Sequence, residues 1–352
     1  MGAQRLEDVR KMRGAPLLLL QTYCVLLSLC AGSIAHADQN VVSTGASHPE
    51  CSSAFEALPI DENGNPVEKN SDGENKPPPT IEGHFSYHRE KYIKYDEKCL
   101  KDWDNLAEDT KNFLRPRLGV IFLASDNTRF EDTPYCSVFR IRQTIVVTAR
   151  HCETESDLGF VNSYAVFMDN PHDNIRFMER IGQIGDVYSS SDLTDYVIWK
   201  TSDDKKHDAV FNSSDIRRVF LDNQAIAIVA FSIAAWYVDD NRKKENWLNY
   251  IRFSRVNASK IWRLEEVKKI HGNTNTNDEC LYHRAPTFSG MSGAPIVGLR
   301  IVRSGEKELF IIGIHLRNGT AVRLEGDECG DVPTFNVGIK IPEAIAERLT
   351  EQ

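Results

Sequence analysis

The stretch TIVVTARHC, residues 144–152, places a histidine and a cysteine directly after a run of β-branched residues. β-Branched residues favour strands, so the run predicts a strand that ends just before His151. Similar short strands are expected at 118–123, 138–142, 196–200, 225–231, 294–302, 309–316 and 336–341. Turn signals separate these strands, and this pattern predicts an antiparallel barrel or sandwich. Pro342 can begin a final helix.

Two further stretches complete a possible catalytic set. In TDYVIWK, residues 194–200, an aspartate leads into an apolar strand, and in SGMSGAP, residues 289–295, a serine lies between glycines. A serine nucleophile needs a base, a carboxylate that holds the imidazole tautomer, and backbone N–H groups for the oxyanion. The chain order His151, Asp195, Ser292 matches one of the chain orders known for such triads. Together the three stretches predict a Ser-His-Asp hydrolase.

Each of these residues also has an ordinary structural interpretation. A lone histidine before a cysteine is usually packed or exposed, an aspartate before a strand is usually a turn residue, and a glycine-flanked serine is often a simple turn. Asp192 is the alternative to Asp195 as the orienting acid. Asp195 is favoured because it directly precedes the apolar strand, where a carboxylate is most readily buried.

The three motifs resemble those of the chymotrypsin-like serine peptidases, and within them the bacterial glutamyl endopeptidase (V8-like) branch. The resemblance covers residues 116–352 and implies an all-β fold of two antiparallel six-stranded barrels followed by a C-terminal helix. It assigns the base to His151, the acid to Asp195, the nucleophile to Ser292 and the oxyanion hole to Gly290 and Ser292. It implies protein or peptide substrates and neither an organic cofactor nor a metal.

The resemblance also suggests a substrate preference. Pro286 stands where trypsin-like members carry an acid, and Thr287 and His315 resemble the pair that glutamyl endopeptidases direct at an acidic substrate side chain. We therefore expect cleavage after Glu or Asp. The alternative is that His315 is a packed strand residue. Arg317 and Asn318 depart from the glycines common in the family, and Arg317 either adds a positive charge for the substrate or narrows the entrance.

Met291, just before the serine, departs from the family pattern as well. In digestive relatives an acid at this position pairs with a newly formed N-terminal amine, and a methionine cannot. Activity is therefore not expected to depend on one particular N-terminus. The rival to an active peptidase is a catalytically silent homologue that uses the same cleft as a protein-binding module.

The N-terminus has the features of an export signal. A basic start precedes the apolar stretch 17–29, and Ala35-His36-Ala37 then forms a small-x-small cleavage site. We expect a signal peptide over 1–37 and a secreted or periplasmic protein without a membrane anchor after cleavage. An uncleaved membrane anchor is the alternative.

Residues 38–115 are expected to be a pro-region or an accessory segment. If they are a pro-region, the chain is a zymogen. The polar stretch 61–79 predicts a flexible linker. Apolar residues at helical spacing over 97–114 predict one amphipathic helix that docks on the peptidase domain, 116–352.

Six cysteines remain beyond the signal, and an even number in an exported chain indicates disulfides. The family resemblance implies Cys136–Cys152. Cys280–Cys329 is expected because both fall in the second half of the domain, and Cys51–Cys99 follows by elimination. No CxxC pair is present, so a zinc site is not expected.

The formal net charge of −9 argues against a general nucleic-acid binder, which needs a basic face. Hydrophobic residues make up 41% and charged residues 26%, the balance of a folded soluble protein. The oligomeric state is left open by the sequence.

Overall fold

The computed structural model describes residues 93, 96–124, 133–153, 162–181, 191–202, 213–218, 225–232, 235–236, 239–254, 260–272, 276–287, 290–301, 307–318, 328–332 and 334–350. All belong to the unit Ala46–Gln352. The expected signal peptide, the linker and Cys51 lie outside the described residues. In the part of the chain that is described, no helix is long and apolar enough to cross a membrane.

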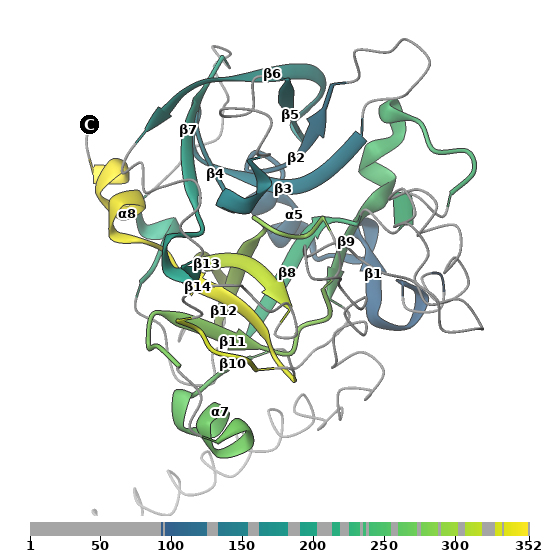
Figure 1. Cartoon of the computed structure of the whole chain (residues 1–352). Coiled ribbons are helices and arrows are strands. Elements are labelled where there is room, and N and C mark those ends of the chain that lie inside the picture. Colours follow the sequence, from purple (N-terminus) through teal and green to yellow (C-terminus); the bar gives the residue numbers. More distant parts are fainter. Residues whose placement is uncertain are drawn as a thin grey trace, which may run out of the picture. The chain divides into compact units, whose positions relative to one another are not determined.

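The elements of the first half (Figure 1) are β1 Leu100–Asp102, η1 Trp103–Asn105, α5 Glu108–Leu114, β2 Leu118–Leu123, β3 Thr133–Arg142, β4 Ile145–Thr148, η2 Arg150–Cys152, β5 Ser163–Phe167, β6 Asn170–Ile181, η3 Asp192–Thr194 and β7 Val197–Thr201. Those of the second half are η4 Ser213–Asp215, β8 Ile226–Phe231, η5 Lys244–Tyr250, β9 Ile251–Ser254, β10 Ile261–Trp262, α7 Leu264–His271, β11 Cys280–His283, β12 Pro295–Ile301, β13 Lys307–Asn318, β14 Asn336–Lys340 and α8 Glu343–Thr350.

The first half closes into an antiparallel barrel with strand order β2-β3-β4-β7-β6-β5. β2 closes it by pairing with both β3 and β5. Gly119 allows this close approach, because a Cβ there would lie 2.7 Å from the carbonyl oxygen of Val166 and from the Phe167 ring. The expected strands 118–123 and 144–148 correspond to β2 and β4.

The strands of the second half, together with β1, form one eight-stranded antiparallel sheet, ordered β1-β9-β8-β12-β13-β14-β11-β10. This half is an open sheet, whereas the family resemblance implied a second closed six-stranded barrel. Its edges are the short strands β1 and β10, which pair only with β9 and β11 respectively within the described residues. The central strands β12 and β13 pair along most of their length and carry the segments that flank the candidate site.

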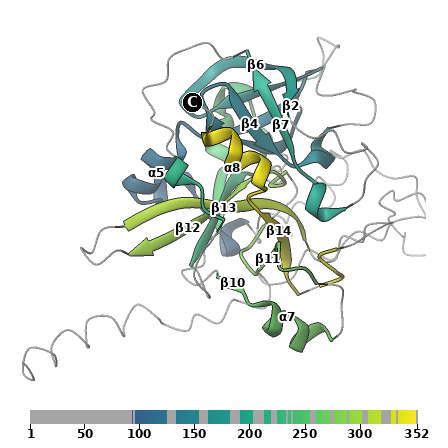
Figure 2. The same cartoon turned by 90° about the vertical axis from the view of Figure 1, so that its left-hand side faces the viewer.

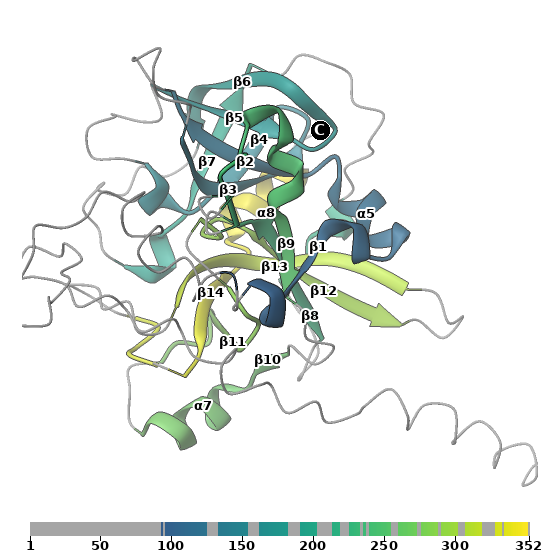
Figure 3. The ribbon, with the colours of Figure 1, turned by 90° about the vertical axis from the view of Figure 1, so that its right-hand side faces the viewer.

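The segment before the barrel is not the single helix expected over 97–114. Residues 97–99 and α5, Glu108–Leu114, are α-helical, and between them Leu100–Asp102 forms β1 on the edge of the sheet beside β9 (Figure 3). Strand pairing and burial outweigh the helical spacing here. Leu100 is 4% exposed and Leu114 fully buried, in two different apolar clusters.

The second half contains the α-helices α7 and α8. The expected C-terminal helix is present as α8. α7 lies beyond β10 and β11, at the end of the second sheet away from the barrel, in all three views (Figure 2).

Candidate active site

His151 and Asp195 come from two neighbouring strands of the barrel. β4 leads into η2, which carries His151, and β7 begins just after Asp195; Thr148 and Val197 are paired in register. Asp195 Oδ1 accepts the backbone N–H of His151 at 2.9 Å, and Oδ2 lies 2.8 Å from His151 Nδ1. Asp195 is 2% exposed, whereas the His151 side chain is 39% exposed. A carboxylate at Nδ1 keeps the proton there and leaves Nε2 as the available base.

The turn that carries His151 is fastened to the barrel beside it. A disulfide joins Cys152 to Cys136 on β3, with Cα atoms 6.1 Å apart. Glu153, which is buried, accepts the Trp199 indole N–H at 3.0 Å and also binds Arg180. The histidine backbone is thus held from both sides while its ring stays accessible.

Ser292 lies in a tight turn immediately before β12. Gly290 and Gly293 have φ angles of +85° and +82°, values that favour glycine. The Ser292 hydroxyl donates to the carbonyl of Leu316 at 2.9 Å. No hydrogen bond joins this hydroxyl to His151 among the described residues, so the side chain must rotate before His151 can take its proton.

The barrel holds this turn through Ser137 on β3. The Ser137 N–H donates to the Ser292 carbonyl at 2.9 Å, and its hydroxyl donates to the Gly290 carbonyl at 3.1 Å. Thr148 in turn donates to the Ser137 carbonyl at 2.7 Å. Gly293 packs so closely here that a Cβ would lie 2.2 Å from Thr148 Oγ1. The turn 290–293, called the nucleophile turn below because it would carry the nucleophile, is therefore held by β3 and packs against Thr148 on β4, the strand that leads to His151.

The backbone N–H groups of the turn fall into two kinds. The N–H of Gly293 donates to the His315 carbonyl at 2.8 Å. Those of Gly290 and Ser292 donate no hydrogen bond within the described part of the chain. These are the two groups expected to hold an oxyanion.

The Met291 side chain is 1% exposed and faces the interior of the second sheet. It packs in an apolar cluster with Leu100, Ile228, Ala294 and Ile312. Apolar packing therefore supports the turn at the position where digestive relatives place an acid.

His315 lies beside the nucleophile turn but is deeply buried, at 2% exposure. Its ring contacts that of His283 on β11, with centroids 5.3 Å apart. Burial lowers the pKa of His315 well below 6.5, and positive charge on His283 or His151 would lower it further. Burial also lowers the pKa of His283 to about 3. Both rings are therefore neutral near pH 7.

No feature of the sequence marked His283 as part of this site. Both its ring nitrogens, and Nδ1 of His315, are buried without a hydrogen-bond partner in the part of the chain described. Thr287, the other expected substrate-binding residue, is half-buried at the end of the segment that follows β11, next to the buried Pro286.

The two aspartates that compete for the acid role have different partners. Asp192 is fully buried and forms a bidentate ion pair with Arg317, whereas Asp195 contacts His151. Asp192 thus neutralises the positive charge of Arg317. The expected pair Cys280–Cys329 is also present, and Cys99 is disulfide-bonded to a cysteine outside the described residues.

Among the described residues, one group of potential metal ligands, Cys136, His151 and Cys152, has its ligand atoms within 4.8 Å of one another. Both sulfurs belong to the disulfide, so they cannot bind a metal as thiolates.

No family model and no curated protein matches the chain. Solved structures similar to it include neuropsin, a serine protease of mouse brain, with 14% identity over 64% of this chain and 90% of that one, at a TM-score of 0.41. Another is a Glu endopeptidase in complex with MPD, with 15% identity over 71% of this chain and 94% of that one, at a TM-score of 0.42. Values this low identify neither family nor activity. The strand topology, the contacts between His151 and Asp195, and the contacts of the Ser292 turn with Ser137 therefore carry the functional proposal.

Proposed function

We propose that this chain is a serine endopeptidase that hydrolyses peptide bonds through an acyl-enzyme on Ser292. The observation that carries the proposal is the two-point contact of buried Asp195 with His151, one oxygen on the backbone N–H and the other on Nδ1. Two contacts fix both the position and the tautomer of the imidazole, as a general base requires.

In the first half-reaction the Ser292 hydroxyl leaves the Leu316 carbonyl and turns toward His151. His151 Nε2 takes its proton as the oxygen attacks the substrate carbonyl, and the N–H groups of Gly290 and Ser292 receive the oxyanion. The imidazolium then protonates the leaving amine. Water attacks the acyl-enzyme by the same steps and releases the acid.

The rival function is that of a silent homologue, and one observation favours it: the Ser292 hydroxyl rests on Leu316 and not on His151. Turnover of a peptide library by wild type and Ser292→Ala separates the two. An active enzyme should lose about a millionfold in turnover in the variant, since loss of a triad member typically has this effect. A wild-type rate equal to that of the variant would favour the binding module.

We further propose that the enzyme prefers Glu, and then Asp, before the scissile bond. Neutral, buried His315 beside the nucleophile turn supports this, because a substrate carboxylate would supply the charge partner that the buried ring lacks. Arg317 plays no part in the preference, because Asp192 neutralises it.

The sign of the pH effect follows from the lowered pKa of His315. Free His315 is neutral between pH 6 and 8, so a complex that protonates it takes up a proton on binding. The ratio of kcat/KM for Glu over Gln peptides should then rise as the pH falls through this range. His315→Ala should abolish the preference. Equal rates for Glu and Gln peptides, or a preference that survives His315→Ala, would refute the acidic pocket and leave the peptidase assignment intact.

We also propose that the protein acts outside the cytoplasm. All five described cysteines are disulfide-bonded: Cys136 to Cys152, Cys280 to Cys329, and Cys99 to a cysteine outside the described residues. Such bonds persist in oxidising compartments. N-terminal sequencing of exported protein should find a start at or near Asp38, and a chain that keeps residues 17–29 would indicate the anchor instead.

A further inference from the structure

Consecutive residues of β13 contact successive parts of the proposed catalytic machinery. The carbonyl of His315 accepts the N–H of Gly293, and the carbonyl of Leu316 accepts the Ser292 hydroxyl. The next residue, Arg317, turns its side chain toward the turn that precedes Asp195. One short stretch of β13 therefore contacts the nucleophile side of the proposed triad through backbone carbonyls and the acid side through the Arg317 side chain.

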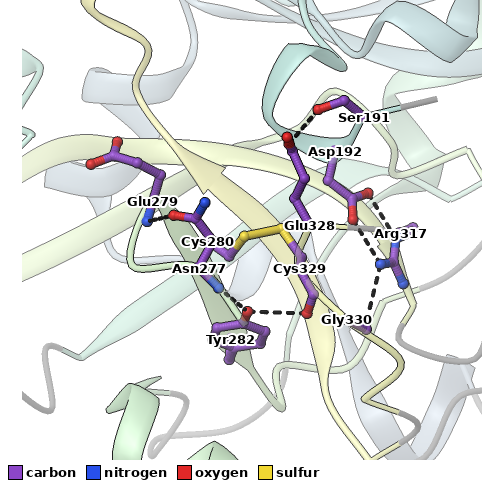
Figure 4. The surroundings of a disulfide bond; sticks show 10 residues. All are labelled: Ser191, Asp192, Asn277, Glu279, Cys280, Tyr282, Arg317, Glu328, Cys329 and Gly330. Atoms are coloured by element: carbon purple, nitrogen blue, oxygen red, sulfur yellow. Dashed lines mark hydrogen bonds and ion pairs between the residues drawn. A yellow bond between two sulfur atoms is a disulfide. The ribbon is translucent and has the colours of Figure 1, made fainter. Parts of the chain in front are cut away.

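The contact on the acid side is a buried, bidentate ion pair (Figure 4). Arg317 Nε lies 2.9 Å from Asp192 Oδ1 and Nη2 lies 2.8 Å from Oδ2. The two side chains are 5% and 0% exposed. Nη2 also donates to the Gly330 carbonyl at 3.3 Å. A planar guanidinium in such a fork fixes orientation as well as distance, which a lysine cannot do.

Asp192 transmits this constraint to the triad through the backbone. It begins the turn η3, and its carbonyl accepts the N–H of Asp195 at 3.1 Å. The hydroxyl of Ser191, at the start of the same turn, binds Glu328 of the second half (Figure 4). The turn η3, which positions Asp195, is thus held by two side chains of the second half of the chain, Arg317 and Glu328.

A disulfide holds the loop that completes this anchor. Cys329 lies between Glu328 and Gly330 and is bonded to Cys280 on β11. The hydroxyl of Tyr282 on the same strand donates to the Cys329 carbonyl at 3.0 Å. Glu328, which binds Ser191, and Gly330, which binds Arg317, therefore lie on a segment that is itself fixed to the second sheet.

We propose that Arg317 is a positioning residue, which holds Asp195 and through it His151 in register with Ser292 across the two halves. The inference rests on the proposed function. It assigns no substrate contact to Arg317, whose side chain is almost fully buried. Its effect should appear in the chemical step and not in substrate binding or in the choice between Glu and Gln.

The double variant Arg317→Gln/Asp192→Asn tests this without leaving a buried charge unpaired. We expect kcat to fall about tenfold or more, with KM and the Glu/Gln ratio nearly unchanged, since a misplacement of about 1 Å can cost about a hundredfold. The downfield proton NMR signal of the His151 Nδ1–H bonded to Asp195 should broaden or move. Arg117→Gln/Asp215→Asn is the matched control, because it removes another arginine–aspartate pair, whose arginine also binds the Phe113 carbonyl. It should keep both kcat and the signal.

An unchanged kcat and an unchanged NMR signal in a folded double variant would overturn the proposal, as would a change confined to KM or to the Glu/Gln ratio. If the double variant does not fold, Arg317→Lys keeps the charge but not the fork and should show the same loss of kcat. A wild type that neither hydrolyses peptides nor reacts at Ser292 would refute the proposed function instead. The NMR signal would still report whether Arg317 positions Asp195.

Discussion

Gly293 shows how little space the nucleophile turn leaves for a side chain. Its φ of +82° is one that other residues rarely adopt, and an added Cβ would meet Thr148 Oγ1 at 2.2 Å and the Ser137 carbonyl at 2.3 Å. Thr148 lies on β4, which leads to His151, and Ser137 lies on β3 next to Cys136 of the disulfide, so neither can move away without a large cost in free energy. The glycine is therefore required by contact as well as by conformation.

We expect Gly293→Ala to lower the free energy of unfolding by about 3–5 kcal/mol, the sum of backbone strain and overpacking. Turnover by any protein that remains folded should fall sharply, because the turn carries Ser292. Gly272→Ala is the matched control: its φ is +77°, but no atom lies within 4 Å of the added Cβ. It should cost about 1–3 kcal/mol, from backbone strain alone, and leave kcat unchanged. Chemical denaturation and kinetics of both variants check this, and equal losses in the two would contradict it.

The three proposed catalytic residues could be named from the sequence because local motifs mark them, and the structure brings two of them, His151 and Asp195, into contact. His151 and Asp195 both adjoin apolar strands, and Ser292 lies between glycines. His283 and the Asp192–Arg317 pair could not be predicted in this way. Their roles arise from contacts between distant segments; Asp192 and Arg317 are 125 residues apart. A histidine in a strand and an aspartate in a turn have ordinary local explanations.

At the scale of single elements, His283 on β11 and His315 on β13 form a contact between two neutral histidine rings. Burial lowers the pKa of His283 to about 3 and that of His315 well below 6.5. As the pH falls below about 6.5, the unfolded chain binds protons that the native state cannot, so stability decreases. For His283 this loss continues until the pH approaches 3.

We expect His283→Leu to reduce this acid sensitivity, by about 1.4 kcal/mol per pH unit below pH 6, the maximum for one such group. Near pH 8 the variant should be about as stable as wild type, because the replaced nitrogens have no partner in the described part of the chain. The measurement is the free energy of unfolding in urea at several pH values, with replacement of His172, which is exposed on β6, as the control. Parallel pH curves for His283→Leu and wild type would contradict the prediction.

The elements themselves were predictable to different degrees. β2, β4, β7, β8, β13, β14 and α8 follow from local composition. The segment 97–114 does not, since its helical spacing competes with pairing between Leu100 and Ser254 on β9. A strand of three residues is too short to show an alternating pattern in the sequence. Its conformation is determined by pairing with β9.

For the molecule as a whole, the segment before the barrel is part of the packed structure. Leu100 shares an apolar cluster with Met291, Leu114 is fully buried, and Asp96 forms an ion pair with Arg252 on β9. Of the two expectations for this region, a removable pro-region or an accessory segment, these contacts favour the second for residues 96–114.

We therefore expect a chain that starts at Arg115 to be much less stable than one that starts near residue 46. Leu100→Ala and Leu114→Ala should each cost about 2–5 kcal/mol, as deletion of a buried leucine side chain commonly does. Chemical denaturation of both chains and both variants provides the measurement. A chain beginning at Arg115 with full stability and turnover would show instead that the segment is a dispensable pro-region.

The central claim is that Asp195, His151 and Ser292 act together as one catalytic unit between the two halves. Reaction with a fluorophosphonate probe, read by intact mass and peptide mapping, tests it most directly, because the probe reacts only with an activated serine. Wild type should bind one probe per chain, at Ser292, with no labelling of Ser292→Ala and much slower labelling of His151→Ala. A folded wild type that stays unlabelled, or that is labelled at another residue, would contradict the account.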